Sequence, residues 1–306
     1  MYVQAAEYLV YAVAVLLLAY IAYFKDKNML FRLFVFLVVA ALFSYFENYN
    51  IALVLSGVLF FNALITSISN KYNILFILLS IFFLFTGFYA HASTNTIALA
   101  MLLGFLSGIH SLSINKSVHN KNIEIKRDIA QIILGSVFLL LFSLLGLFAA
   151  SFIFMAFLLL GAGLGGAAMV YRHSTISKFF YSLERKDAVL GSGAFWLSAG
   201  TLLALSFISS LPYVLTIFAA LFFGDSIATI AGMSLPLRRL PYNRKKSVAG
   251  TLSYFALVAF VSYFFIGFMA LAFAAVAAFV ESLDLPIDDN FGTSLALTLL
   301  AFILAL

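Results

Sequence analysis

The chain has 306 residues, of which 65% are hydrophobic and 9% are charged, and its mean hydropathy is +1.13. A soluble domain is about half apolar and about a quarter charged, so this composition excludes an ordinary soluble protein and indicates a helical membrane protein. The net charge of +5 could suggest a nucleic-acid partner. The cations lie in short loops, however, and we expect no nucleic acid. The absence of cysteine excludes disulfides and thiolate metal sites.

Apolar runs long enough to cross about 30 Å of hydrocarbon recur along the whole chain. They predict an all-α, polytopic fold with about eleven or twelve transmembrane helices. The first run has neither a basic start nor a small-residue cleavage site, so we expect a retained helix rather than a signal peptide. The runs lie near 6–24, 29–46, 51–68, 74–90, 96–113, 129–148, 150–171, 190–209, 211–234, 249–283 (continuous) and 291–306.

The charges of the polar breaks predict the orientation of the chain. Alternate breaks, at 47–50, 91–95, 149–150 and 209–212, contain no Lys or Arg. The remaining breaks carry the cations, which the positive-inside rule places in the cytoplasm. The N-terminus is then outside. We expect an integral multi-pass protein of a prokaryotic plasma membrane or a eukaryotic endoplasmic reticulum, and the oligomeric state is left open.

The two halves of the chain differ in their loops. Residues 1–113 are spans joined by short links, and they predict an N-terminal extension of about five helices. From 114 onward, three longer basic loops appear on the cytoplasmic side, each with an acidic residue. We therefore expect 114–306 to form a catalytic transmembrane core.

One segment, "FGDSIATIAGMSLPLRRLPYNRKKSVAGTLSYF" at 223–255, places Asp225 inside an apolar helix. A charge in hydrocarbon costs on the order of 2.5 kcal/mol or more, so it marks a functional site by default. Gly224, Ala228 and Gly232 recur at every fourth residue and give this helix one bare side. That side permits either close helix packing or close approach of a metal-bound phosphate.

A basic loop follows this helix and leads into "KKSVAGT". A helix start preceded by lysines and capped by Ser or Thr is a ready anion site. The same cations could serve only as topology signals. With Asp225 immediately upstream, we favour phosphate binding. The five cations of the loop are Arg238, Arg239, Arg244, Lys245 and Lys246.

"GDSIATIAG" followed by "KKSVAGT" resembles the signature of the family of dolichol kinase, phytol kinase and CTP-dependent diacylglycerol kinase. Three further segments are similar to blocks of that family in the same order: "EIKRDIAQIILG" (124–135), "ERKDAVLGSGAFWLSAG" (184–200) and "VAAFVESLDLPIDDNFGTSL" (276–295). The resemblance covers roughly residues 120–306. It implies a membrane enzyme that moves the γ-phosphate of CTP, with Mg²⁺, to the hydroxyl of a lipid alcohol at the cytoplasmic face.

Under this resemblance the residues take defined roles. Asp225 and Asp289 would hold the metal, and Asp225, Glu281, Asp288 and Asp289 are the catalytic candidates, one carboxylate acting as general base. Lys245 and Lys246 would contact the triphosphate. The other residues expected at the nucleotide are Gly224, Ala228, Gly232, Arg238, Arg239, Ser247, Gly250, Thr251, Asn290, Arg185 and Lys186.

The sequence also departs from the family pattern. Asp128 and Gln131 occupy what look like a Lys and a His position of the first block, so those roles are not transferred. "MSLPLRR" replaces a more usual Arg and Gly-Lys, and Ala249 replaces a Glu in a manner similar to the diacylglycerol branch. The N-terminal extension favours a polyprenol of the dolichol type as substrate, whereas Ala249 points to another lipid alcohol such as phytol, geranylgeraniol or diacylglycerol.

Three other functions stay open. A membrane cytidylyltransferase would also use CTP, but its usual closing Asp-Arg and Asp pattern is replaced by the Asp-Asp-Asn of 288–290. An ion-coupled transporter would also carry intramembrane carboxylates, although matching halves are not evident. A membrane scaffold would leave the acidic cluster unexplained. If Asp225 and 288–290 share a face, then 249–283 crosses twice in only about 52 Å of helix, either as short helices or with the acidic loop inside the bilayer.

Overall fold

The computed structural model is helical throughout the residues that it describes, which confirms the predicted all-α fold. These residues are 10–11, 13–14, 27–46, 49–67, 73–89, 92–108, 121–171, 173–183, 191–235 and 238–305. They contain no β-strand, and one antiparallel bridge pairs Arg239 with Ser247. The first predicted span, 6–24, lies largely outside the described residues.

Three helical segments are long and apolar enough to cross a membrane, namely Ile123–Val170, Leu211–Ser234 and Val248–Ile266. Seven further apolar helices of the described part are shorter, between 10 and 17 residues. The protein is therefore a helical membrane protein, as its composition predicts. The number of crossings and their orientation remain predictions.

The chain divides into two compact units, and the first consists of Met1–Ile114 with Ser151–Phe180. Its helices α3 (Ile51–Thr66) and α5 (Thr94–Gly108) pack closely, because a Cβ at Gly104 would lie 2.6 Å from Cβ of Phe61. In the same contact Asn62 Nδ2 donates to Ser107 Oγ at 2.7 Å. The helices of this unit are α2 (Lys27–Phe46), α3 (Ile51–Thr66), α4 (Asn73–Tyr89), α5 (Thr94–Gly108), the later part of α6 (Lys121–Val170) and most of α7 (Thr175–Leu183).

Helix α6 bends sharply at one residue. The sequence predicts a break at 149–150, whereas the helical conformation is interrupted at Gly146, with φ 75° and ψ 177°. Glycine adopts a positive φ without the steric penalty of a side chain, so the break falls on the nearest glycine rather than on the two alanines. Residues 115–150 belong to the second unit and 151–180 to the first. The catalytic core at 114–306 stays a prediction.

The second unit is organised around one buried span. This span consists of α9 (Leu211–Phe218), the π-helical segment η2 (Ala219–Gly224) and α10 (Asp225–Ser234). Side chains from Val214 to Phe222 are almost fully buried. Around the span lie the first part of α6 together with α8 (Ser192–Phe207), α11 (Val248–Ile266), α12 (Met269–Ser282) and α13 (Asp289–Ala305).

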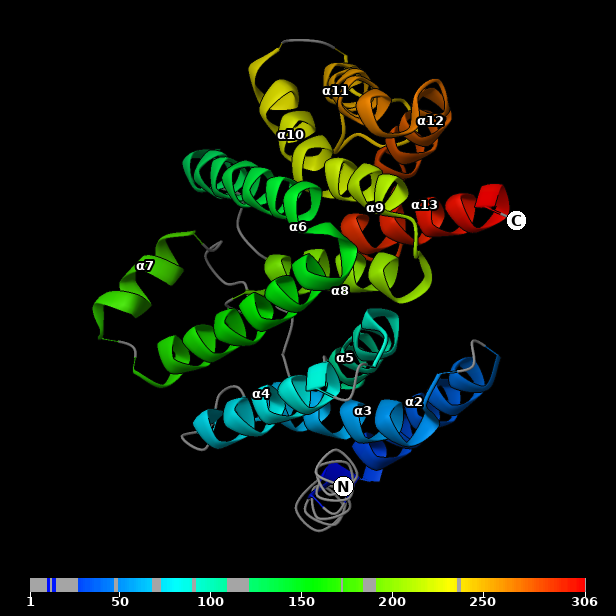
Figure 1. Cartoon of the computed structure of the whole chain (residues 1–306). Coiled ribbons are helices and arrows are strands. Elements are labelled where there is room, and N and C mark those ends of the chain that lie inside the picture. Colours follow the sequence, from blue (N-terminus) through cyan, green and yellow to red (C-terminus); the bar gives the residue numbers. More distant parts are fainter. Residues whose placement is uncertain are drawn as a thin grey trace. The chain divides into compact units, whose positions relative to one another are not determined.

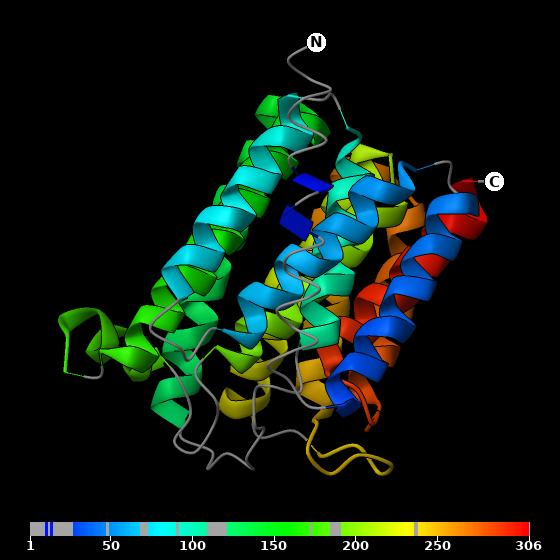
Figure 2. The ribbon, with the colours of Figure 1, turned by 90° about the horizontal axis from the view of Figure 1, so that it is seen from below.

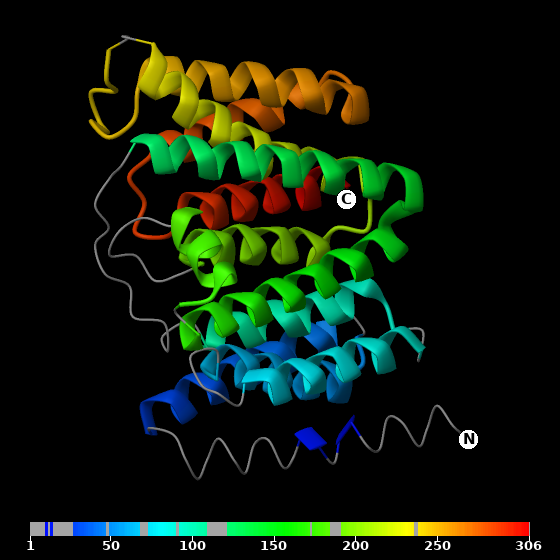
Figure 3. The same cartoon turned by 90° about the vertical axis from the view of Figure 1, so that its left-hand side faces the viewer.

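Helices α11 and α12 form a helical hairpin within 249–283, where the sequence predicts two short crossings. α11 has 19 residues and α12 has 14, and Gly267 joins them with φ 58°. The hairpin returns the chain towards the end where α10 stops, because Asn243, in the loop after α10, donates to the carbonyl oxygen of Ser282 at the end of α12. Within the second unit, the start of α6, the 238–247 loop and the α12–α13 connection lie at one end (Figure 2 and Figure 3). Three segments that are distant in sequence therefore meet there.

We expect Gly135→Ala to destabilise the protein. Its Cβ would collide with Cβ of Phe222, where α6 meets η2. Alanine favours a helix by up to about 1 kcal/mol over glycine, but overpacking at a rigid backbone contact costs about 1–3 kcal/mol, so the collision dominates. Gly161→Ala, on the same helix with nothing within 4 Å of its Cβ, is the matched control. Thermal unfolding in detergent should give a lower Tm for the first variant only, and equal Tm values would contradict the packing.

Candidate active site

A π-helical segment positions Asp225. In η2 the backbone hydrogen bonds span five residues, which leaves carbonyl groups available to other donors. Tyr254 Oη donates to the carbonyl oxygen of Ala220 at 3.0 Å, and Gln131 Nε2 donates to that of Leu221 at 2.9 Å. Side chains from α11 and α6 thus satisfy the widened turn immediately before Asp225. Asp225 consequently begins α10 directly after a turn whose backbone is anchored to these two helices.

The bare side of α10 faces α11. A Cβ at Gly224 would lie 2.6 Å from the ring of Tyr254, and a Cβ at Gly232 would lie 2.9 Å from Ser247 Oγ. Gly250 closes the same contact, because its Cβ would lie 2.8 Å from the carbonyl oxygen of Ala228. Helix packing therefore accounts for the small residues at these positions. A role of Gly224, Ala228, Gly232 and Gly250 in nucleotide binding stays a prediction.

The 238–247 loop is folded back on itself and tied to the end of α12. Val248 N donates to the carbonyl oxygen of Arg238 at 3.0 Å, and Leu240 N donates to that of Lys246 at 3.1 Å. Asn243, almost fully buried, donates through Nδ2 to the carbonyl oxygen of Ser282 at 3.0 Å. The loop therefore presents its two lysines to α12 and to the connection that follows it.

Ser247 caps helix α11 as the sequence predicts for a helix start. Its Oγ accepts a hydrogen bond from Gly250 N at 3.1 Å, and its backbone is extended. Thr251, one residue further on, has a buried Oγ1 without a hydrogen-bond partner. A cap leaves other amides of the first turn available to an anion, so this helix start is suited to phosphate.

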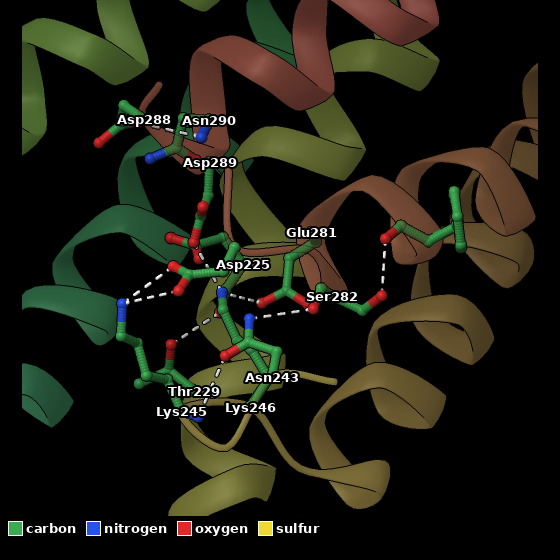
Figure 4. A network of polar contacts seen from close by, with 12 residues as sticks. Asp225, Thr229, Asn243, Lys245, Lys246, Glu281, Ser282, Asp288, Asp289 and Asn290 are labelled. Atoms are coloured by element: carbon green, nitrogen blue, oxygen red, sulfur yellow. Dashed lines mark hydrogen bonds and ion pairs between the residues drawn. The ribbon is translucent and has the colours of Figure 1, made fainter. Parts of the chain in front are cut away.

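Lys246 is the centre of an ion-pair cluster (Figure 4). Its Nζ donates to Glu281 Oε1 and, at 2.7 Å, to Asp289 Oδ2. Glu281 is buried, and its other oxygen, Oε2, has no hydrogen-bond partner. Asp225 is drawn with this cluster in Figure 4, and its negative charge acts on both Lys246 and Glu281. The structure thus brings together Asp225, Lys246, Glu281 and Asp289, which the sequence places up to 64 positions apart.

The neighbouring lysine is in a different environment. Lys245 Nζ lies 2.9 Å from Asp284 Oδ1, and their side chains are 76% and 60% exposed, against 23% for Lys246. Ion pairs in such high-dielectric surroundings contribute little to stability. Arg238 and Arg239 are exposed as well, and Arg239 donates to the carbonyl oxygen of Lys245 at 2.9 Å. Among these cations, Lys246 alone makes a largely buried contact.

Burial and charge shift the pKa values at the edge of this cluster. Burial lowers the pKa of Lys246, but Glu281 and Asp289 outweigh it, and the net pKa lies above the ordinary value. Lys246 therefore stays charged in the cluster. The pKa of Asp288 is raised to about 6, first by burial and then by the charges of Asp225 and Asp289, against the lowering effect of hydrogen bonds from the backbone of Asn290 and Phe291.

The Asp-Asp-Asn segment starts helix α13. Asp288 Oδ1 accepts a hydrogen bond from Asn290 N at 3.0 Å, an N-terminal capping arrangement. The carbonyl oxygen of Asn290 packs closely on Gly200 of α8, where a Cβ would lie 3.1 Å away. Capping and packing account for part of this segment, and Asp289 is the member whose side chain reaches Lys246. Arg185 and Lys186 lie outside the described residues, so their predicted contact with phosphate stays a prediction.

Sequence reasoning missed two residues of helix α6. Asp128 is fully buried, and the charge of Asp225 acts on it. Gln131 bonds to η2, as described above. Both occupy positions where the sequence departs from the family that it resembles, and that departure was the signal available. The antiparallel approach of α6 to the buried span could not be read from the sequence.

The fit of the cluster to Mg²⁺ follows from its ligand types. No three His, Cys, Asp or Glu side chains in the described parts of the chain converge to hold a metal by themselves. Mg²⁺ is usually bound by one or two carboxylates, and waters and substrate phosphates complete its shell. Asp225 and Asp289, which the sequence predicts as the metal ligands, are carboxylates of this kind, and Asp289 contacts Lys246 through Oδ2. The residues therefore fit an open Mg²⁺ site, not a closed one.

We expect the two adjacent lysines to differ sharply when replaced. Lys246→Ala leaves Glu281 buried without a cation, and breaking a buried pair in this way costs about 3 kcal/mol. Lys245→Ala removes an exposed pair and should cost less than about 1 kcal/mol. Unfolding of both variants in detergent, followed by circular dichroism against temperature, measures the difference. Similar losses in the two variants would show that the cluster does not stabilise the fold.

Comparisons with known proteins support a relationship to lipid-alcohol kinases. The chain is 31% identical to a chloroplastic farnesol kinase of Arabidopsis thaliana over 156 residues, which cover 45% of this chain and 50% of the relative. It thus spans about half the length of the curated relative that it matches. No family model matches the chain. No solved structure matches it either.

Proposed function

We propose that the protein is a CTP-dependent kinase of an isoprenoid alcohol. The observation that carries the proposal is the cluster of Lys246, Glu281, Asp289 and Asp225 beside the capped start of α11. Phosphoryl transfer requires positioned phosphates, neutralised charge and an activated hydroxyl. A lysine, a helix start and several carboxylates at the end of a transmembrane core are suited to these tasks. The similarity to a farnesol kinase supports the same class of substrate.

The proposed reaction transfers the γ-phosphoryl group of CTP. The hydroxyl oxygen of the alcohol bonds to the γ-phosphorus, the bond from that phosphorus to the β–γ bridging oxygen breaks, and CDP leaves. A carboxylate accepts the hydroxyl proton. Glu281 is suited to this role because its Oε2 is buried without a partner, and Asp288 and Asp289 are the other candidates. When bound, Mg²⁺ would neutralise charge on the phosphates.

The basic residues take part in binding under this proposal. Lys246 would exchange its carboxylate partners for the triphosphate, since phosphate oxygens compete directly with Glu281 and Asp289. Asp289 would then be released to join Asp225 as a metal ligand. Lys245 is exposed enough to reach an incoming phosphate without breaking a buried contact. Asp225 is the metal ligand that does not depend on this exchange.

The finer proposals concern the alcohol and the site's location. We propose a long-chain polyprenol of the dolichol type as the substrate and a cytoplasmic active site. The apolar helices allow an isoprenoid chain to remain in the bilayer while its hydroxyl reaches the acidic cluster. The relative is named for farnesol, so farnesol is the natural comparison substrate.

The reaction is tested directly with CTP labelled in its γ-phosphate. Purified protein in detergent with magnesium should give a labelled lipid monophosphate and CDP from a polyprenol, and the same assay with farnesol ranks the two alcohols. Release of pyrophosphate with phosphatidic acid would indicate a cytidylyltransferase instead. The absence of turnover with every lipid alcohol tested would contradict the kinase and favour a transporter.

We expect Asp225→Asn to lower turnover by orders of magnitude while the protein stays folded. The amide keeps the size of the carboxylate but removes the charge, and metal-assisted neutralisation supplies several kcal/mol of transition-state stabilisation. Removing a costly half-buried charge should leave the Tm unchanged or higher. Asp284→Asn, at the exposed partner of Lys245, is the control and should retain activity. Near-normal turnover of Asp225→Asn at saturating CTP and magnesium would show that this aspartate is structural.

A further inference from the structure

Asp128 of helix α6 has an unusual environment for a carboxylate. The residue is 0% exposed, and neither of its carboxylate oxygens has a hydrogen-bond partner. Buried carboxylates are normally paired or hydrogen-bonded, because an unsatisfied charge in a low-dielectric interior is costly. The roles proposed above for the lysines and for Asp225 leave Asp128 without a function.

The protein's own cations compensate Asp128 only partly. Arg127 Nη2 lies 3.6 Å from Asp128 Oδ1, too far for a hydrogen bond. The same nitrogen lies 3.3 Å from Glu124 Oε2, so one guanidinium serves two buried carboxylates. Lys246 is paired with Glu281 and Asp289. Asp128 is thus left with negative charge that no nearby side chain fully balances.

The fold forces Asp128 towards Asp225. Gly135 lets α6 approach Phe222 closely, and Gln131 binds the carbonyl oxygen of Leu221 at 2.9 Å. These contacts fix α6 antiparallel to the buried span, one or two turns from Asp128. The negative charge of Asp225 acts on Asp128 from the neighbouring helix. Two carboxylates therefore come from neighbouring helices at about the same level of the second unit, and Arg127 is the cation that contacts Asp128.

Carboxyl groups outnumber cations in the cluster around Asp128 and Asp225. Among the residues that the structure describes there, two cations, Arg127 and Lys246, accompany a larger set of carboxyl groups. A triphosphate brings further negative charge, and like charges repel strongly where water is scarce. The carboxyl groups are Glu124, Asp128, Asp225, Glu281, Asp288 and Asp289.

We propose that Asp128 and Asp225 together bind a divalent cation before the nucleotide arrives. The ligands are oxygen atoms without His or Cys, which selects a hard cation of the Mg²⁺ or Mn²⁺ type. Waters complete the shell in the nucleotide-free protein, and phosphate oxygens can later replace them. Asp128 is a ligand that the related family's pattern does not supply at this position. The proposal deepens the proposed function, because this cation is the one that the triphosphate would meet.

The test measures Mn²⁺ binding to the 306-residue chain in detergent, without nucleotide or lipid. Binding is detected as a decrease of the free-ion signal in electron paramagnetic resonance. Wild type should bind Mn²⁺, and Mg²⁺ should displace it. Asp128→Asn should weaken the affinity by about tenfold or more, and its metal-free Tm should rise because a buried like-charge pair is removed. The matched control Asp284→Asn should bind Mn²⁺ as wild type does.

Two outcomes would overturn the proposal. One is unchanged Mn²⁺ affinity in Asp128→Asn, and the other is the absence of Mn²⁺ binding by wild type. If Asp128→Asn fails to fold, Asp225→Asn provides the same readout, and unchanged Mn²⁺ affinity in that variant overturns the proposal as well. The kinase assay tests the proposed function independently of the cation site. If Asp128→Asn loses Mn²⁺ binding but wild type phosphorylates no alcohol, the cation site is retained and the kinase function is rejected. If wild type phosphorylates an alcohol but Asp128→Asn binds Mn²⁺ with unchanged affinity, the kinase function is retained and the cation site is rejected.

Discussion

The second unit depends on how a carboxylate is accommodated in its most buried helix. Asp225 follows a π-helical segment whose free carbonyl groups accept hydrogen bonds from Gln131 of α6 and Tyr254 of α11. Those two bonds join three helices at the level of the acid. The same junction needs Gly135 and Gly224, because a side chain at either position would collide with an aromatic residue. Backbone chemistry and small residues therefore hold the charge in place, and the lysine cluster is assembled around it.

Much of this arrangement could be predicted from the residues. Hydropathy gave the all-helical fold, and "KKSVAGT" gave a capped helix start, which Ser247 confirms through its bond to Gly250. The contact of Lys246 with Glu281 and Asp289 was not specified, because it depends on the hairpin of α11 and α12 returning the chain to the same end. The small residues of α10 illustrate a genuine ambiguity. The same pattern of small residues is compatible with close helix packing and with close approach of a phosphate, and the structure shows the packing.

Other features were not accessible from a single sequence. The π segment has no signal of its own in "AALFFG", since it arises from tertiary contacts that stabilise a widened turn. The placement of Asp128 required knowing that α6 runs antiparallel to the buried span. Its sequence context, where an acid replaces an expected base, marked Asp128 as unusual. That context did not indicate that Asp225 lies on the neighbouring helix. The break at Gly146 shows the same limit, because apolar runs locate helix ends only to within a few residues.

The short return helix has a consequence for the lipid around it. With 14 residues, α12 rises about 21 Å, which is less than the roughly 30 Å hydrocarbon thickness of a bilayer. Hydrophobic mismatch of this kind is relieved by local thinning of the membrane or by polar groups sitting below the headgroup level. Under the proposed function, either response would shorten the distance that an alcohol headgroup must travel to reach Glu281 at the end of this helix. A membrane deformation set by helix length would thus assist access to the acidic cluster without any moving lid.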